Sequence, residues 1–471
     1  MDGGAGGAEG RAAAILDRGR RRARRQRRAR GGTRDQPDRP CAHQRGLPRR
    51  GGAVSSAGAR LESAEQIAEG QFGRLRRMGD APRRFPIVIW NPAWLTLLAT
   101  LGLCAVGIHC IDLTGGVDAE GVSPLAKRQI AFAFFGLLAA AFVAVPHYKF
   151  IARLTPLLAV VVLAMLIFLL IPMVPESIVS PRKGARRWIN LGFFDFQPSE
   201  LAKIVYVLAV ARYLRYRKNH RRFLGLAPPA IITFVPMALI LVEPDLGTAL
   251  LFLPTLFAML IVAGARLKHL LLVVVVASAM APAMYPLLQP HQKDRIRAIY
   301  YQFIGDDRHQ DSINYQGNLA MTVAGAGGLR GHSAEKSRAM IHFNHLPEDH
   351  NDMIFAVATN RFGLLGALGV IGLYMLWIIG AIWTAALCRE PVGRLVAVGL
   401  GVIVITQMTI NIGMTIGILP ITGMTLPFVS YGGSSLVAGF LMVGLLCNIG
   451  MRHPAYLQRQ SFEFDNEDDD D

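Results

Sequence analysis

The chain has 471 residues, a formal net charge of +17 and a hydrophobic content of 52%, with a mean hydropathy of +0.34. This profile excludes collagen-like, disulfide-rich and ordinary soluble proteins. The charge has three parts, because residues 1–90 carry 21 Arg, no Lys and nine acidic residues, residues 463–471 carry seven acidic residues, and the rest of the charge is spread over an apolar body.

The first ninety residues are rich in Gly, Ala and Arg, and they cannot bury enough apolar surface to fold. We predict a disordered cytoplasmic tail over residues 1–89 and an acidic disordered tail over 456–471. An arm that binds RNA, DNA or anionic lipid is the alternative for the basic tail, and Met78 offers an alternative start of translation. For the body of the protein, residues 90–455, no nucleic-acid partner is expected.

From Trp90 onward, apolar runs long enough to cross about 30 Å of hydrocarbon recur along the chain. Their near-continuous hydrophobicity excludes a β-barrel, whose strands would alternate in polarity. The predicted fold is therefore an all-α, polytopic membrane protein with about ten transmembrane helices. The predicted spans are 94–112, 129–146, 153–175, 199–214, 224–243, 246–264, 269–289, 353–386, 395–416 and 429–450.

Lys and Arg residues in the short connections place the N-terminus inside the cell. With ten spans, both termini are then cytoplasmic. The longest connection, about 290–352 between the seventh and eighth spans, is extracytoplasmic. A basic cluster over Arg182–Arg187 on the outer side weakens the contrast in charge between the two sides.

A loop as long as 290–352 without its own apolar core is usually functional or disordered. It contains the acidic stretch His345–Asp352, which leads directly into the eighth span at Met353. A carboxylate at this membrane boundary is partly desolvated, which suits it to work as a general base. The alternative, which the residues alone favour, is that Asn351 or Asp352 caps the following helix.

Two further places hold ionisable groups at membrane depth, where such groups indicate function by default. Glu200 and Lys203 lie three residues apart on one face of a helix that begins at Pro198. They are either ligands or a mutual ion pair that stabilises the bundle. Glu243 and Asp245 lie in a tight turn between two spans, and the Pro and Gly of that turn indicate turn chemistry first.

Two other segments have simple structural interpretations. Lys183–Trp188 is predicted to be a flexible basic segment whose arginines could bind a phosphate, although an ordinary interfacial belt of Trp and Arg is the simpler interpretation. Gly432 and Gly433 open the final span, where small residues favour close helix packing.

The sequence contains no Walker loop, Rossmann fingerprint or metal-spaced histidine cluster. We therefore predict no metal site and no required cofactor. The five cysteines lack any paired spacing, which favours neither a disulfide framework nor a zinc site; they are Cys41, Cys104, Cys110, Cys388 and Cys447.

Taken together, these segments resemble the SEDS proteins, the RodA/FtsW family, over about residues 90–455. The resemblance rests on five separate motifs that follow one another in the family's order. These motifs are Lys183–Trp188, Gln197–Glu200, Pro244–Thr248, Leu346–Asp352 and Leu426–Ser435.

The resemblance implies a peptidoglycan glycosyltransferase of the bacterial inner membrane. Such an enzyme polymerises lipid II at the outer face of the membrane, for cell elongation or division, and has a class B penicillin-binding protein as its partner. Lipid II and membrane lipids are then its small-molecule partners, and a divalent cation could assist. The alternatives are a flippase or transporter of a lipid-linked precursor, and a non-catalytic scaffold for the penicillin-binding protein.

The resemblance also implies roles for individual residues. The family's essential loop carboxylate corresponds to Asp352, which we predict to be the catalytic base. Positive charge is needed to hold the departing diphosphate, whereas a nucleotide site is not, because the donor is already activated. The predicted substrate-binding residues are Lys183, Arg186, Arg187, Glu200, Lys203 and Asp245.

The chain departs from the family's pattern at a few positions. Glu243 stands where the family usually has Gln, and Asn351 stands where Thr is usual. The segment Asn344–Asp349 differs more, so the contacts to the acceptor substrate there are in doubt. The pair Thr422-Gly423 is more typical of the elongation branch, RodA, than of the division branch, FtsW.

Overall fold

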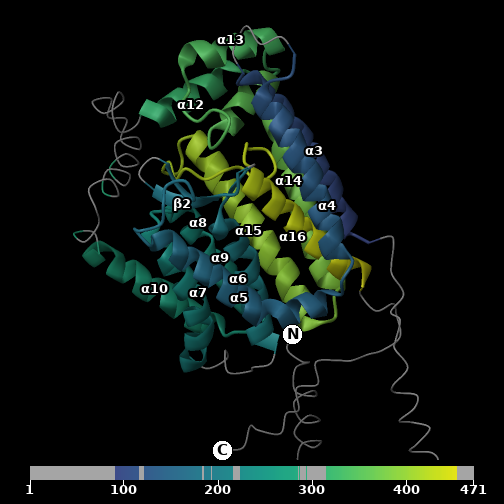
Figure 1. Cartoon of the computed structure of the whole chain (residues 1–471), viewed down its shortest axis with the longest axis vertical. Helices are drawn as coiled ribbons and strands as arrows, with labels where there is room; N and C mark the ends of the chain where they lie inside the picture. The colour runs from purple at the N-terminus through teal and green to yellow at the C-terminus, as the bar shows by residue number, and fades with distance from the viewer. Residues whose placement is uncertain are drawn as a thin grey trace, which may run out of the picture. The chain divides into compact units, whose positions relative to one another are not determined.

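The computed structural model describes residues 91–115, 121–182, 185–192, 194–215, 223–284 and 315–452, together with Pro286, Lys293 and Arg297. The predictions for both terminal tails, for Met78 and for Lys183 fall outside these residues. Within them the chain is almost entirely helical, as predicted (Figure 1).

A helix lies at each of the ten places where a span was predicted. Among the described residues, seven helical segments are long and apolar enough to cross a membrane. Of the other three, α6 carries four charged residues, α8 and α9 divide one predicted span at Leu251, and α10 has only a short apolar stretch. The helices are α3 (Ala93–Leu113), α4 (Pro124–Ala144), α5 (Tyr148–Leu170), α6 (Pro198–Arg215), α7 (Ala227–Val242), α8 (Leu246–Leu250), α9 (Phe252–Val262), α10 (Leu267–Met284), α14 (Ile354–Leu387), α15 (Pro391–Thr415) and α16 (Gly433–Met451).

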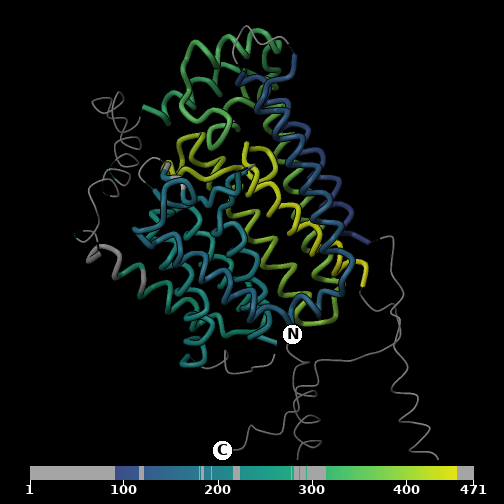
Figure 2. The backbone as a smooth tube through the Cα atoms, in the orientation of Figure 1, coloured from purple at the N-terminus to yellow at the C-terminus, as the bar shows by residue number. Residues whose placement is uncertain are grey.

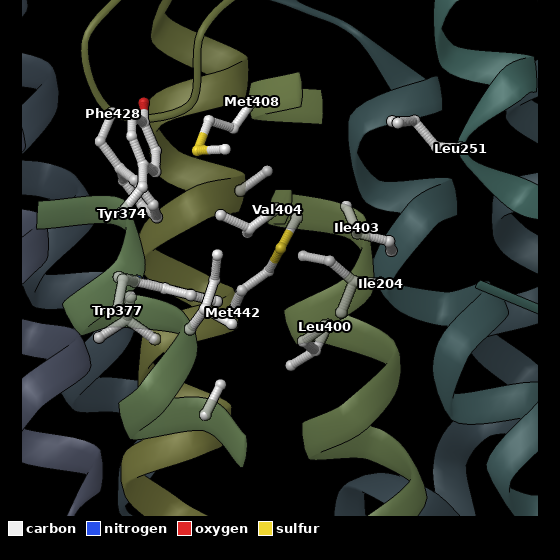
Figure 3. Packing of buried hydrophobic residues seen from close by; sticks show 14 of the residues in the cluster. Ile204, Leu251, Tyr374, Trp377, Leu400, Ile403, Val404, Met408, Phe428 and Met442 are labelled. Atoms are coloured by element: carbon white, nitrogen blue, oxygen red, sulfur yellow. The ribbon is translucent and has the colours of Figure 1, made fainter. Parts of the chain in front are cut away.

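The helix α15 lies at the centre of the bundle. It packs against α14 and α16 on one side and against α6 and α9 on the other. Leu400, Ile403 and Val404 of α15 belong to a cluster of buried hydrophobic residues. Figure 3 shows them in this cluster, near Ile204 of α6. Large apolar side chains on α4, α5 and α10 remain exposed, as expected of helices that face lipid.

The helices α4 and α16 approach each other closely. A side chain at Gly444 of α16 would collide with the backbone of Ala140 in α4, and one at Gly136 of α4 would collide with the ring of Phe440. Small residues let membrane helices pack at short range.

The start of α4 is defined by Ser123, whose hydroxyl accepts a hydrogen bond from the backbone N–H of Ala126 at 3.2 Å.

The long connection before α14 contains two helices, α12 (Tyr315–Ala326) and α13 (Ala334–Asn344). They lie over one end of the bundle (Figure 1). The glycine-rich segment between them contacts α14 where this helix is interrupted at Gly363, whose φ of 68° favours glycine. The backbone N–H of Leu364 donates to the carbonyl of Gly328 at 2.8 Å. Gly328 and Gly363, for which the sequence alone indicated no role, therefore lie where the loop is joined to the bundle.

A small antiparallel sheet corrects one prediction. Its strands are β1 (Val179–Arg182), β2 (Ala185–Asn190) and β3 (Asp195–Phe196), in the order β1-β2-β3. The basic segment was predicted to be flexible, and that prediction is wrong for Ala185–Trp188, which lies in β2. Strand pairing provides hydrogen-bond partners for backbone groups that would otherwise be left unsatisfied near the membrane.

Candidate active site

A cavity of about 1460 Å³ lies where the sheet, the helix ends and the loop before α14 meet. Residues 417–432, called the C-terminal segment below, run between the helices α12 and α13 and the rest of the bundle (Figure 2). The wall comes from α4, the sheet, the start of α6, the α7–α8 turn and residues 348–352. Its ionisable residues are Arg128, Arg187, Asp195, Glu200, Asp245, Glu348, His350 and Asp352.

The loop before α14 is held in place by hydrogen bonds that its backbone carbonyls accept from other parts of the chain. The carbonyl of His350 accepts from the N–H of Tyr431 at 2.8 Å, and that of Asn351 accepts from the hydroxyl of Ser430 at 2.5 Å. The carbonyl of Asp352 accepts from the side-chain amide of Asn411 at 2.9 Å. Three consecutive carbonyls are therefore fixed by the C-terminal segment and α15, which restricts where the side chains between them can lie.

The side chain of Asp352 lines the cavity and is 8% exposed. The prediction that Asn351 or Asp352 caps the following helix is wrong, because Met353 is the N-cap of α14 and no side chain caps it. The amide of Asn351 instead donates to the carboxylate of Glu348 at 2.6 Å. Asp352 therefore lies in the cavity wall and does not cap the helix.

His350, beside Asp352, was not singled out from the sequence. Its Nδ1 lies 2.9 Å from the carboxylate of Asp349, which also accepts from the backbone N–H of His350 at 2.7 Å. The hydrogen bond to the carboxylate of Asp349, and then the nearby negative charges, raise the pKa of His350 above its usual range, and burial opposes them. Its place in the acidic stretch was the only available signal.

Glu200 and Lys203 form the ion pair that was one of the two interpretations. Their Oε1 and Nζ atoms are 2.9 Å apart, and both side chains are buried. Lys203 also donates to Gln407 of α15 at 3.3 Å, and Gln407 donates to the carbonyl of Thr425 at 3.0 Å. Glu200 lines the cavity, whereas Lys203 lies behind it. The pair thus joins α6 to α15 and to the C-terminal segment.

Asp245 has a structural role in the turn between α7 and α8, as the interpretation of its segment as a turn predicts. It is the N-cap of α8, where its carboxylate accepts from the backbone N–H of Thr248 at 3.2 Å and from the hydroxyl of the same residue at 2.9 Å. Its Oδ2 also lies 3.3 Å from the amide of Gln197. Asp245 lines the cavity as well, so one carboxylate shapes both the turn and the site.

The two arginines of β2 have separate surroundings. Adjacent strand residues point to opposite faces, and Arg186 accordingly donates to the carbonyls of Ile171, Pro172 and Val174 at the end of α5. These three carbonyls follow Leu170, the last residue of α5. Arg186 does not line the cavity, which weighs against the predicted contact with substrate.

Arg187 does line the cavity. Its Nε donates to the carbonyl of Glu243 at 2.9 Å, and its Nη2 donates to that of Pro244. These bonds hold the sheet against the α7–α8 turn. The guanidinium lies at the cavity wall, with two of its donors occupied by backbone.

Glu243 is buried, and neither carboxyl oxygen has a hydrogen-bond partner among the described residues. Burial raises its pKa from 4.5 to about 8, with a smaller contribution from Asp245 and an opposing one from Arg187. The neutral acid is therefore the form that the fold favours. This residue stands where the SEDS pattern usually has the neutral side chain Gln.

The burial of Glu243 predicts a stability that depends on pH. Because its pKa is higher in the folded protein, its contribution is complete below pH 4.5 and is lost as the pH rises through about 8. The total loss is on the order of 5 kcal/mol, since one pKa unit corresponds to about 1.4 kcal/mol. Glu243→Gln should flatten this part of the curve in thermal unfolding followed from pH 5 to pH 9. An unchanged slope in the variant would assign the pH dependence to other groups.

Gly432 and Gly433 line the cavity, and Gly433 also packs closely against a neighbouring helix, as predicted. A side chain at Gly433 would meet the ring of Phe132 in α4 at 3.0 Å. Gln129, also in α4, donates to the carbonyl of Ser430 at 3.0 Å and accepts from the N–H of Gly432 at 3.3 Å. The segment that fixes the Asp352 loop is therefore itself held by α4.

No group of three or more His, Cys, Asp or Glu side chains suited to a metal ion occurs among the described residues. The four cysteines of that part of the chain are buried and free. The ionisable groups that the cavity wall offers for chemistry include the carboxylate of Asp352, two guanidinium groups and the ring of His350.

Several known proteins are similar to this chain along most of its length. The model of a family described as cell cycle protein, comprising FtsW, RodA and SpoVE, matches residues 91–454. Stage V sporulation protein E of Bacillus subtilis is 31% identical over 365 residues, which are 76% of this chain and 97% of that protein. A probable peptidoglycan glycosyltransferase FtsW of Coxiella burnetii is 32% identical over 374 residues, 77% of this chain and 97% of that protein.

Solved structures agree with these relatives. A chain from a peptidoglycan synthase complex that coordinates polymerization and crosslinking aligns with a TM-score of 0.63 and 28% identity, over 76% of this chain and 97% of that one. The rod shape determining protein RodA of Thermus thermophilus aligns with a TM-score of 0.55 and 26% identity, over 78% of this chain and 98% of that one.

Proposed function

Since this chain belongs to the FtsW, RodA and SpoVE family of cell cycle proteins, we propose that it is a peptidoglycan glycosyltransferase that polymerises lipid II. Relatives named as peptidoglycan glycosyltransferases support this activity. The observation that carries the proposal is Asp352, a carboxylate in the cavity wall whose backbone is fixed by Asn411.

The proposed reaction joins two lipid-linked sugars. Asp352 accepts the proton of the acceptor hydroxyl while that oxygen attacks the anomeric carbon of the donor. The bond from this carbon to the diphosphate breaks, and the polyprenyl diphosphate leaves with the electron pair. Because the donor already carries a good leaving group, the reaction requires no nucleotide.

Positive charge is needed where the diphosphate departs. Arg187 keeps its proposed role, because it lines the cavity and can exchange its bonds to backbone carbonyls for bonds to phosphate. Arg186 is less well placed, and Lys183 stays a proposal from the sequence. Glu200 and Asp245 line the wall where they could accept hydrogen bonds from substrate hydroxyls, and Lys203 would hold Glu200 in place.

The protein is a membrane protein, and we propose that it lies in the bacterial inner membrane with both termini in the cytoplasm. The Lys and Arg residues of the short connections support this orientation. The cavity would then open to the outer side, where lipid II is used. A class B penicillin-binding protein is the proposed partner, and membership of one similar chain in a peptidoglycan synthase complex supports it.

A divalent cation is proposed only as an aid to charge neutralisation, and no other cofactor is proposed. The cavity wall holds five carboxylates against two arginines, so a bound cation could offset part of this negative charge. A role in elongation rather than division is proposed from Thr422-Gly423, which lies in the wall.

The test of the activity is the polymerisation of labelled lipid II by the purified protein together with its penicillin-binding partner. Glycan chains longer than the disaccharide are the expected product. Lipid II that crosses liposome membranes without forming polymer would support a flippase instead. Polymer made only by the partner would reduce this chain to a scaffold.

Asn411 is expected to act as a positioning residue for Asp352. Its amide donates to the carbonyls of Asp352 and Met424, at 2.9 and 2.6 Å. Asn411→Ala should lower kcat about tenfold to a hundredfold with a small change in KM, because a base displaced by about 1 Å loses rate rather than binding. Thr415→Val is the matched control, since Thr415 lies one turn away on α15 and, among the described residues, its hydroxyl bonds only to the carbonyl of Asn411. Equal losses in both variants would mean general destabilisation of α15.

A further inference from the structure

Arg128 was not predicted as a site residue, and its surroundings set it apart from the other cavity cation. It lies in the second turn of α4 and lines the cavity. Its guanidinium makes no hydrogen bond and no ion pair within the described part of the chain, whereas Arg187 donates to two carbonyls. Of the two arginines in the described wall, Arg128 has all its donors uncommitted.

The position of Arg128 on α4 follows from helical geometry. Leu125, Arg128, Phe132 and Phe135 all line the cavity. Their spacings of three and four residues place them on one face of the helix. Ala131 lines the cavity as well, whereas Lys127 is exposed and does not line it. A single cation therefore interrupts an apolar stripe that faces the cavity.

This stripe reaches the surface that faces lipid. Phe135 lines the cavity and is also 61% exposed. The ring of Phe132 lies 6.4 Å from that of Tyr431, and Tyr431 lies 5.8 Å from the ring of His350. The aromatic rings of Phe132 and Tyr431 thus connect the α4 stripe to His350 in the Asp352 loop. Phe135 connects the same stripe to the exposed apolar surface.

The charge of the cavity shows what Arg128 would bind. Asp195, Glu200, Asp245, Glu348 and Asp352 give the wall five carboxylates. An anionic substrate enters such a site only where a cation is available to pair with it. Guanidinium groups bind phosphate oxygens through two parallel hydrogen bonds. A ligand with a phosphate head and a hydrocarbon tail would match both Arg128 and the apolar stripe next to it.

We propose that Arg128 binds the diphosphate of a polyprenyl-linked substrate, with the start of the polyprenyl chain against Phe132 and Phe135. This inference rests on the proposed function for the identity of the lipid. It assigns to α4 an anion site separate from the β2 arginines. The enzyme handles two lipid-linked substrates at once, and each of them carries a diphosphate.

The test measures binding of undecaprenyl diphosphate to the full-length protein in detergent, without turnover. Arg128→Gln should weaken binding about tenfold to a hundredfold, which is the range for the loss of a charge-assisted bidentate contact. Arg128→Lys should lie between Arg128→Gln and the wild type, because Lys keeps the charge without the fork. Lys127→Gln is the matched control and should bind like the wild type. Both residues are exposed, so thermal unfolding should be unchanged.

Three results would overturn the proposal. The first is equal affinity in Arg128→Gln and the wild type, and the second is an equal loss in Lys127→Gln, which would mean a diffuse effect of charge. The third is inorganic diphosphate that competes as well as undecaprenyl diphosphate, which would remove the contribution of the lipid chain. Because binding is measured without turnover, a protein that binds through Arg128 but forms no glycan would contradict the proposed function alone.

Discussion

Asp352→Asn is expected to lower the rate of lipid II polymerisation by a factor of about 10² to 10⁴, the usual contribution of a general base. The amide keeps the size of the side chain but cannot accept the proton of the acceptor hydroxyl. The carbonyl of Asp352 still accepts from Asn411, because that bond belongs to the backbone. The fold should therefore survive while the chemistry fails.

The control for this prediction is Asp349→Asn. Asp349 lies in the same loop and loses the same charge, yet it does not line the cavity. Its effect should stay below about tenfold, through the orientation of His350. Initial rates with labelled lipid II, together with the thermal midpoint of each variant, decide the matter. Polymerisation at the wild-type rate by Asp352→Asn would remove this residue from the mechanism.

Lys203→Met is expected to destabilise the folded protein by about 3–5 kcal/mol, the cost of leaving a buried charge without its partner. Glu200 would then lose the ammonium group at 2.9 Å in a position where it is only 6% exposed. The measurement is the free energy of unfolding in mixed micelles. Lys149→Met is the matched control, because it breaks the partly exposed pair with Glu390 and should cost about 0–1 kcal/mol.

The double variant Glu200→Gln with Lys203→Met separates the two interpretations of this pair. Removing both charges should recover most of the lost stability, since neither buried charge is left alone. If the variant is then stable but inactive, Glu200 contributes to the site as well as to the bundle. A stable and fully active variant would leave the pair with a structural role only.

The helical bundle was predictable because its cause is local. Lipid offers backbone groups no hydrogen-bond partners, so an apolar run of membrane length must form a helix whatever its neighbours are. Helical spacing is local too: it placed Glu200 and Lys203 one turn apart on one face of α6, where an ion pair was one of the two interpretations. The cap at Asp245 was also within reach, since it acts within three residues.

The site depended on contacts that no local pattern contains. Arg186 and Arg187 are neighbours in sequence, yet strand geometry sends them to different partners, and Arg187 bonds to a carbonyl 56 residues away. Asn411 reaches the carbonyl of Asp352 across 59 residues. Arg128 was not singled out from the sequence, and only the fold places it in the cavity wall.

By itself, the sequence determined the helices, the membrane setting and the family, because hydrophobic length and short motifs act over one or a few turns. Only the tertiary structure decided that Asp352 lines a cavity instead of capping α14, and that Arg128 has free donors while Arg187 is bonded to backbone. The physical reason is that the partner of a side chain depends on which elements pack together. That packing is a property of the whole chain.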